Sequence, residues 1–188
     1  MIAMSDNRPV LQIGRHQVYC YESDWLLAAL ERATVAAGLS PFPCLEEISS
    51  GIFEYLETAC PLKLLPVERL HDRVRLMLEK IGCPAIARHF EPCAPPVTVS
   101  LLDAAHRAGP GFELAFFEAI RSETTELRRL GAAGIRFTGH RDAILHLSGQ
   151  PRWNRRCEAL LEELHAFLEN LGVPAEPETT DRPESVAA

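Results

Sequence analysis

The stretch VYCYESDWLLAALERA, residues 18–33, decides how the first half of the chain folds. It opens with a short aromatic run that favours β-structure and passes through Ser23 and Asp24 into an amphipathic segment. Ser and Asp are favoured at helix N-caps because their side-chain oxygens accept hydrogen bonds from the exposed amides of the first turn. The pattern therefore predicts a strand that turns directly into a helix over 24–37, which Gly38 ends.

Composition and charge exclude several classes of protein. The 188 residues are 47% hydrophobic and 24% charged, as in globular proteins with a real core. No run of about 18 apolar residues occurs, so we expect no membrane contact. The first residues lack the pattern of a signal peptide, so we expect a soluble, cytoplasmic protein. The formal net charge of −7 argues against nucleic acid as a partner, since phosphate binding needs clustered cations.

The six cysteines form no CxxC pair. The nearest candidate for a metal site is CPAIARHFEPC, with Cys83, His89 and Cys93, which offers three ligands where a structural zinc site uses four. We therefore expect no metal site and no disulfide framework, and we interpret most thiols as small apolar residues of the core.

Residues 9–13 and 17–21 are β-favouring runs around the turn GRH and predict a hairpin. A hairpin alone is only marginally stable, so it must lie on helices. These are expected over residues 24–37, 43–59, 66–81 and 84–90. The Pro-rich segment 91–97 then marks a domain boundary, which makes 9–91 the first domain.

The second domain is expected over 97–172 and is less regular. Residues 98–108 form either a strand that runs into a helical turn or a helix capped by Ser100, and the helix is preferred. The remaining expected elements are helices over 112–130 and 152–171 and a hairpin over 135–147. The tail 173–188 is rich in Pro, acids and small residues, and we expect it to be disordered.

Residues 9–91 resemble the ATP-cone, a small nucleotide-binding regulatory domain of ribonucleotide reductases and of the repressor of their genes. The resemblance rests on Tyr21 at the end of the second strand, on ALERA, on RLHDRV and on GCPAIARHF. It implies a mainly α (α+β) fold, with a hairpin and four helices, followed here by a small helix–hairpin–helix module. It also implies ATP or dATP as ligand, with Arg15, Arg32 and His71 as the binding residues.

This sequence departs from the family pattern at the residues that hold phosphate. The family has a Lys-Arg pair on the first strand where this chain reads LQIGRHQ, and Val67 replaces a Thr. A hydrogen bond to a charged group contributes about 1.5–3 kcal/mol, and about 1.4 kcal/mol corresponds to a tenfold change in affinity. The departures therefore predict a degenerate site with weakened or lost nucleotide binding.

No catalytic constellation is evident. GHRD (139–142) resembles the start of a kinase catalytic loop, but the following Asn and a Gly-rich phosphate loop are absent from the sequence. We expect a non-catalytic regulatory protein with an ATP-cone-like domain. Two alternatives stay open: an interaction module or homo-oligomer with helices 112–130 and 152–171 as its face, and a small enzyme that uses His140 or His146.

Overall fold

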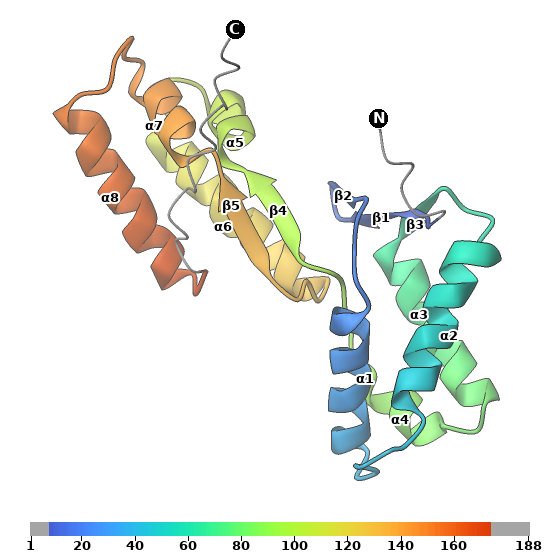
Figure 1. Cartoon of the computed structure of the whole chain (residues 1–188). Coiled ribbons are helices and arrows are strands. Elements are labelled where there is room, and N and C mark those ends of the chain that lie inside the picture. The colour runs from blue at the N-terminus through green and yellow to red at the C-terminus, as the bar shows by residue number, and fades with distance from the viewer. Residues whose placement is uncertain (1–7, 174–188) are drawn as a thin grey trace, which may run out of the picture. The chain divides into compact units, whose positions relative to one another are not determined.

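The computed structural model describes residues 8–173 and has a mixed α+β fold, with eight helices and five short strands in that range (Figure 1). The chain divides into two compact units. The first runs to Val97 and takes in Thr124–Ile135, and the second comprises Thr98–Glu123 and the chain from Arg136 onwards. No helix of the described range has the length and apolar character needed to cross a membrane.

The first unit contains a three-stranded sheet. Strands β1 (Val10–Ile13) and β2 (His16–Val18) form the predicted antiparallel hairpin, with Leu11 opposite Val18. A third strand, β3 (Leu64–Pro66), pairs parallel to β1 and was not predicted. Strand β1 therefore pairs on both sides, with β2 and with β3 from a distant part of the chain. The added strand stabilises a hairpin that would be only marginally stable alone.

Four helices follow the predicted order: α1 (Asp24–Ala36), α2 (Leu45–Thr58), α3 (Val67–Lys80) and α4 (Pro84–His89). In Figure 1 the strands lie across one end of α1, α2 and α3, and α4 lies at the opposite end. Gly38 follows α1 with φ 71°, as expected of a helix C-terminus. Ser23 occupies the N-cap position of α1, but its side chain makes no capping hydrogen bond, so that detail of the prediction is wrong.

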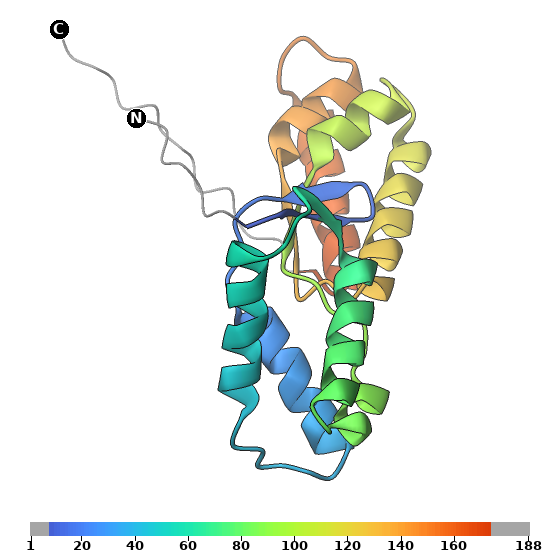
Figure 2. The same ribbon diagram turned by 90° about the vertical axis from the view of Figure 1, so that its right-hand side faces the viewer.

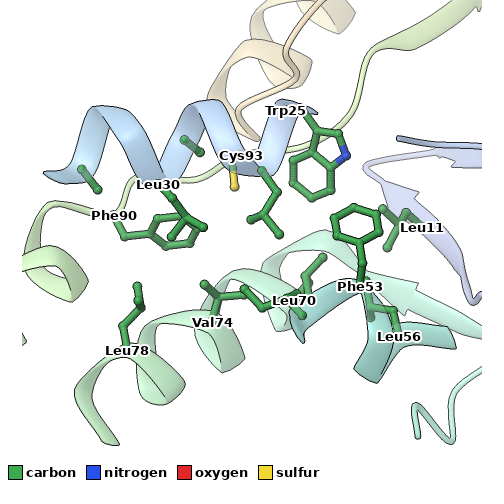
Figure 3. Close-up of a cluster of buried hydrophobic side chains, with 14 of the residues drawn as sticks. Leu11, Trp25, Leu30, Phe53, Leu56, Leu70, Val74, Leu78, Phe90 and Cys93 are labelled. Carbon is green, nitrogen blue, oxygen red and sulfur yellow. The ribbon is translucent and has the colours of Figure 1, made fainter. Parts of the chain in front are cut away.

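The core of the first unit lies between these helices and the sheet. Leu11, Leu30 and Leu78 are each 0% exposed, and the Trp25 and Phe53 rings meet at 6.4 Å between centroids (Figure 3). Tyr21 donates a hydrogen bond from its hydroxyl to the carbonyl of Pro9 at 2.8 Å, which holds the chain entering β1 to the chain leaving β2. Burial of this kind stabilises a domain by about 25 cal/mol per Å² of apolar surface.

The rest of the described chain, to residue 173, supplies two further strands and four helices. Strand β4 (Val97–Ser100) pairs with β5 (Ile135–Thr138). The helices are α5 (Leu101–Ala108), α6 (Glu113–Arg129), α7 (His140–Ser148) and α8 (Arg155–Asn170). The predicted helices over 112–130 and 152–171 are confirmed as α6 and α8, within three residues at each end.

The predicted hairpin over 135–147 is wrong, and with it the helix–hairpin–helix arrangement. Only its first arm is a strand; the second is α7, which begins after Gly139 (φ 75°). Its buried residues Ala143, Ile144 and Leu147 follow helical spacing. In so short a segment, the sequence pattern alone does not distinguish a helix from the alternation of a strand.

Two further expectations concern the ends of the second domain. Residues 98–108 are not one helix: β4 continues to Ser100, whose side chain caps α5 by accepting a hydrogen bond from the Asp103 amide at 3.2 Å. The cap is therefore confirmed and the preferred helix over 98–100 is wrong. Of the tail predicted to be disordered, Val173 is buried and 174–188 lie outside the described residues.

Candidate functional site

A cavity of about 590 Å³ lies between α2 and α3 in the first unit. Figure 2 shows these two helices standing on either side, with α1 behind them. Most of its lining is contributed by the two helices, with Leu65 of β3 between them. The lining residues are Glu47, Ile48, Gly51, Ile52, Tyr55, Leu56, Leu65, Leu70, Arg73, Val74, Met77 and Ile81.

The walls of the cavity are amphipathic helix faces that do not close on each other. The lining residues of α2 (48, 52 and 55) and of α3 with its C-cap (70, 74, 77 and 81) recur at helical spacing. Such faces normally pack together. Here they run from the buried core out to the surface. Leu56 and Leu65 are 1% exposed, whereas Tyr55 is 41% and Ile81 50% exposed. The cavity is therefore an apolar groove whose floor belongs to the core and whose rim reaches solvent.

Gly51 stands in the middle of α2 and lines the groove. Its φ is not positive, and a Cβ built on it would meet no atom within 4 Å, so neither backbone geometry nor crowding requires a glycine. A glycine in a helix interior costs about 0.8–1.0 kcal/mol relative to alanine. Gly51 therefore carries this cost at a position that lines the groove and has open space around it.

Three polar side chains line the groove. Arg73 Nη1 donates a hydrogen bond to the Tyr55 hydroxyl at 2.9 Å, which fixes both side chains across the gap from α3 to α2. Glu47 lies in the first turn of α2, where the helix dipole favours an acid. At 1.5 Å per residue, Glu47 is about 12 Å along the helix from Tyr55. The groove therefore has a cation at its sheet end and a carboxylate at the other.

The three predicted nucleotide-binding residues lie on three different elements, and none of them lines the groove. Arg15 is exposed in the turn between β1 and β2, Arg32 is exposed on α1, and His71 is half-buried on α3. Leu11 and Trp25, at the sheet end of the helices, are buried core residues (Figure 3).

His71 contacts the segment that leaves α4, and the Arg32 guanidinium acts on the same segment through its charge. His71 Nε2 lies 3.1 Å from the carbonyl oxygen of Phe90, and its ring stacks on the Phe90 ring at 5.2 Å between centroids. Burial raises the pKa of the Cys93 thiol from 9.0 to about 12, and the nearby Arg32 guanidinium opposes this rise. Of the three predicted residues, His71 thus contacts this segment and Arg32 affects it through its charge. Phe90, Cys93 and Ala94 of the segment are buried in the core.

Histidines in the second unit pair with each other. His140 and His165 meet edge to face at 5.5 Å between ring centroids, and His106 and His146 at 4.4 Å. In the described part of the chain, no three His, Cys, Asp or Glu side chains lie close enough to share a metal ion. The expectation of a small enzyme built on His140 or His146 stays a prediction.

The helices predicted to form a dimer face pack partly within the chain. Phe117 of α6 meets Phe167 of α8 at 4.9 Å between centroids, and Arg156 of α8 forms an ion pair with Glu113 of α6 at 2.9 Å. These residues are therefore already engaged. A homo-oligomer or a protein partner that uses helices 112–130 and 152–171 stays a prediction; on α6, Leu114 is exposed.

The chain matches no family model, no curated protein and no solved structure. The groove between α2 and α3 was not predicted, because each helix face by itself has the pattern of an ordinary core face. The signal that could have indicated it is Gly51, a helix breaker placed among apolar residues at the centre of a long amphipathic segment.

Proposed function

We propose that this chain is a ligand-binding regulatory protein, whose first unit accepts a small, mainly apolar molecule between α2 and α3. Small-molecule sites are typically concave, about 300–1,000 Å³ in volume, and apolar with a few placed polar groups. The groove, at about 590 Å³, has this size and this lining. The observation that carries the proposal is that the apolar faces of α2 and α3 line an open groove instead of packing on each other.

The helix propensity of Gly51 supports this interpretation. Alanine at this position would strengthen α2 by about 1 kcal/mol without touching any neighbour. A residue that disfavours its own helix, where the structure does not require it, is expected at functional sites. There, function is often gained at the expense of stability. A binding site is such a function, and the apolar walls indicate what kind of molecule enters.

Regulation would follow from the connection between the two walls. Helices α2 and α3 are joined through β3, which pairs with β1 of the hairpin. A ligand that contacts both helices binds best when they stand apart, and it therefore favours that arrangement by its differential affinity. Any surface of the first unit that differs between the two arrangements would then respond to the ligand.

A neutral fluorescent probe tests the proposal. Phenylnaphthylamine, which is uncharged and apolar, should bind the purified chain saturably with one site and brighten. Gly51→Phe places a ring in the groove and should abolish this site. Gly51→Ala is the matched control, since it leaves most of the volume and should retain it. Absence of saturable binding, or equal binding by the Phe variant, would contradict the proposal.

Purine nucleotide is the second candidate ligand, at a different place. It is supported by the resemblance of residues 9–91 to the ATP-cone, since the side chains of Arg32 and His71 can both donate to phosphate. ATP, dATP and their diphosphates, with and without magnesium, should then raise the melting temperature. The Arg32→Ala, His71→Ala double variant should lose this rise. A flat response up to millimolar nucleotide would exclude this candidate.

A further inference from the structure

The shape of the groove limits what can lie in it. Its lining runs from Glu47 to Leu56 on α2 and from Leu70 to Ile81 on α3, lengths of about 14 Å and about 16 Å at 1.5 Å per residue. Spread over this length, 590 Å³ corresponds to a mean cross-section of about 40 Å². A helix with its side chains is about 10–12 Å across and is too wide to be enclosed. A single hydrocarbon chain or a flat ring system fits.

The charges at the groove give this molecule a direction. In the described part of the chain the Tyr55 hydroxyl is the one hydrogen-bond partner of Arg73, and no carboxylate pairs with it. A guanidinium has five N–H donors, so most of them remain available to a ligand. Because Tyr55 accepts the bond from Arg73, its own O–H can also donate. Two donors therefore converge at the sheet end of an apolar groove.

We infer that the ligand is an elongated amphiphile with one anionic group, a carboxylate or a group of similar geometry, bound by Arg73 and Tyr55. This inference rests on the proposed function of the same groove. The apolar chain of the ligand runs from this head group along Ile52 and Met77 towards Ile81. Glu47 lies at that far end and repels an anion there, so the ligand has one preferred orientation.

The same features disfavour other ligands for this groove. A triphosphate needs several cationic donors, and Arg73 is the one cation among the lining residues. A cationic amphiphile would have to place its head group beside Arg73, or reverse and pair with Glu47 alone; both side chains are exposed, so solvent screens either ion pair. An anionic head has two donors, the Arg73 guanidinium and the Tyr55 hydroxyl, whereas a cationic head has the single carboxylate of Glu47.

Three probes with one chain and different heads test the inference: decanoate, decanol and decylammonium, each competing with phenylnaphthylamine at neutral pH. Decanoate should bind most tightly. Arg73→Gln should weaken decanoate roughly 10- to 100-fold, the effect of losing a charge-assisted hydrogen bond, and leave decanol unchanged. Arg75→Gln is the matched control, because Arg75 is exposed on the same helix but does not line the groove. It should leave decanoate unchanged.

The outcomes separate this inference from the proposed function. Equal affinities for decanoate and decanol, or equal effects of Arg73→Gln and Arg75→Gln, would show that the ligand needs no anionic head group. Binding of phenylnaphthylamine would still show that the groove takes a ligand. If none of the three alkyl probes displaces the fluorophore, an elongated amphiphile is not the ligand of this groove. Failure of the fluorophore itself to bind would overturn the proposed function. Circular dichroism of each variant checks that it is folded.

Discussion

Cys93 shows how burial sets the chemistry of one residue. It is 5% exposed, and burial raises the pKa of its thiol from 9.0 to about 12, against the opposing effect of Arg32. The folded chain therefore holds this proton more tightly than the unfolded chain does. Its contribution to the free energy of unfolding is fully present below pH 9.0 and is lost as the pH rises towards about 12.

The loss has a limiting slope of about 1.4 kcal/mol per pH unit for one proton. Cys93→Ala should remove this part of the pH dependence, as measured by urea unfolding at a series of alkaline pH values. Arg32→Gln should raise the pKa of Cys93 further, so the free energy of unfolding should continue to fall up to a higher pH. The explanation is wrong if the wild type and Cys93→Ala lose stability with the same slope.

Gly131 is required where two segments of the first unit cross. Its φ is 78°, and a Cβ built on it would overlap the backbone carbonyl of Pro92. Gly131→Ala should therefore lower the free energy of unfolding by about 3 kcal/mol or more, from backbone strain plus displacement of residue 92. Gly38→Ala is the control, since Gly38 has φ 71° with open space around it. It should cost about 1–2 kcal/mol from strain alone. If Gly131→Ala and Gly38→Ala lower the free energy of unfolding equally, as measured by urea unfolding, the overlap with Pro92 is ruled out.

At the scale of single elements, the long amphipathic helices were predictable and the short elements were not. Helix α3 buries Val67, Leu70, Val74 and Leu78, whose spacing of three and then four residues fits a helix and not the alternation of a strand. Strand β3 has three residues and pairs with a strand more than fifty residues earlier, so nothing local indicates it. Segment 135–147 is short enough that both periods describe it, and packing of its Ala143 and Ile144 selects the helix.

Helix α8 depends on its N-cap. The Asn154 side chain accepts a hydrogen bond from the Cys157 amide at 3.1 Å and satisfies one of the exposed donors of the first turn. Asn154→Ala should lower the free energy of unfolding by about 1 kcal/mol. Ser23→Ala is the matched control, because Ser23 is the N-cap of α1 without a side-chain bond and should change stability by less than about 0.5 kcal/mol. Urea unfolding measures both, and a larger loss for Ser23→Ala would contradict this account.

At the scale of the whole molecule, the first unit is not one continuous segment. The Gly131 and Gly134 carbonyls accept hydrogen bonds from the Ala94 and Val97 amides, each at 2.9 Å, and the Ala133 amide donates to the Ala94 carbonyl at 2.9 Å. A domain confined to 9–91 stays a prediction, and a shortened chain can test it.

A fragment ending at Val97 lacks these three hydrogen bonds and should unfold with a free energy roughly 2–3 kcal/mol lower than the full chain. Trp25 is 6% exposed and reports unfolding of the first unit by fluorescence. Trp153→Phe in the full chain leaves Trp25 as its one tryptophan and makes the two measurements comparable. Equal stabilities would show that residues 124–135 do not support the unit.

The candidate site was less predictable than the fold because a cavity is a property of two elements together. Ile52 and Val74 each have the pattern of a core residue, and only the separation of their helices turns them into walls. His71 was selected as a ligand-binding residue, yet the structure places its ring against Phe90. Arg73, two residues later, was overlooked because an arginine on an exposed helix face is normally only solvated.

Met77 gives the most direct test of the central claim that the groove between α2 and α3 binds a ligand. It lines the groove, and the two other methionines of the sequence, Met1 and Met4, lie outside the described residues. In a chain labelled at the methionine methyl groups, titration with decanoate should shift the NMR signal of Met77 saturably and leave the other two unchanged. Gly51→Phe should abolish the shift. A Met77 signal that stays fixed while decanoate binds elsewhere, or does not bind, would contradict the claim.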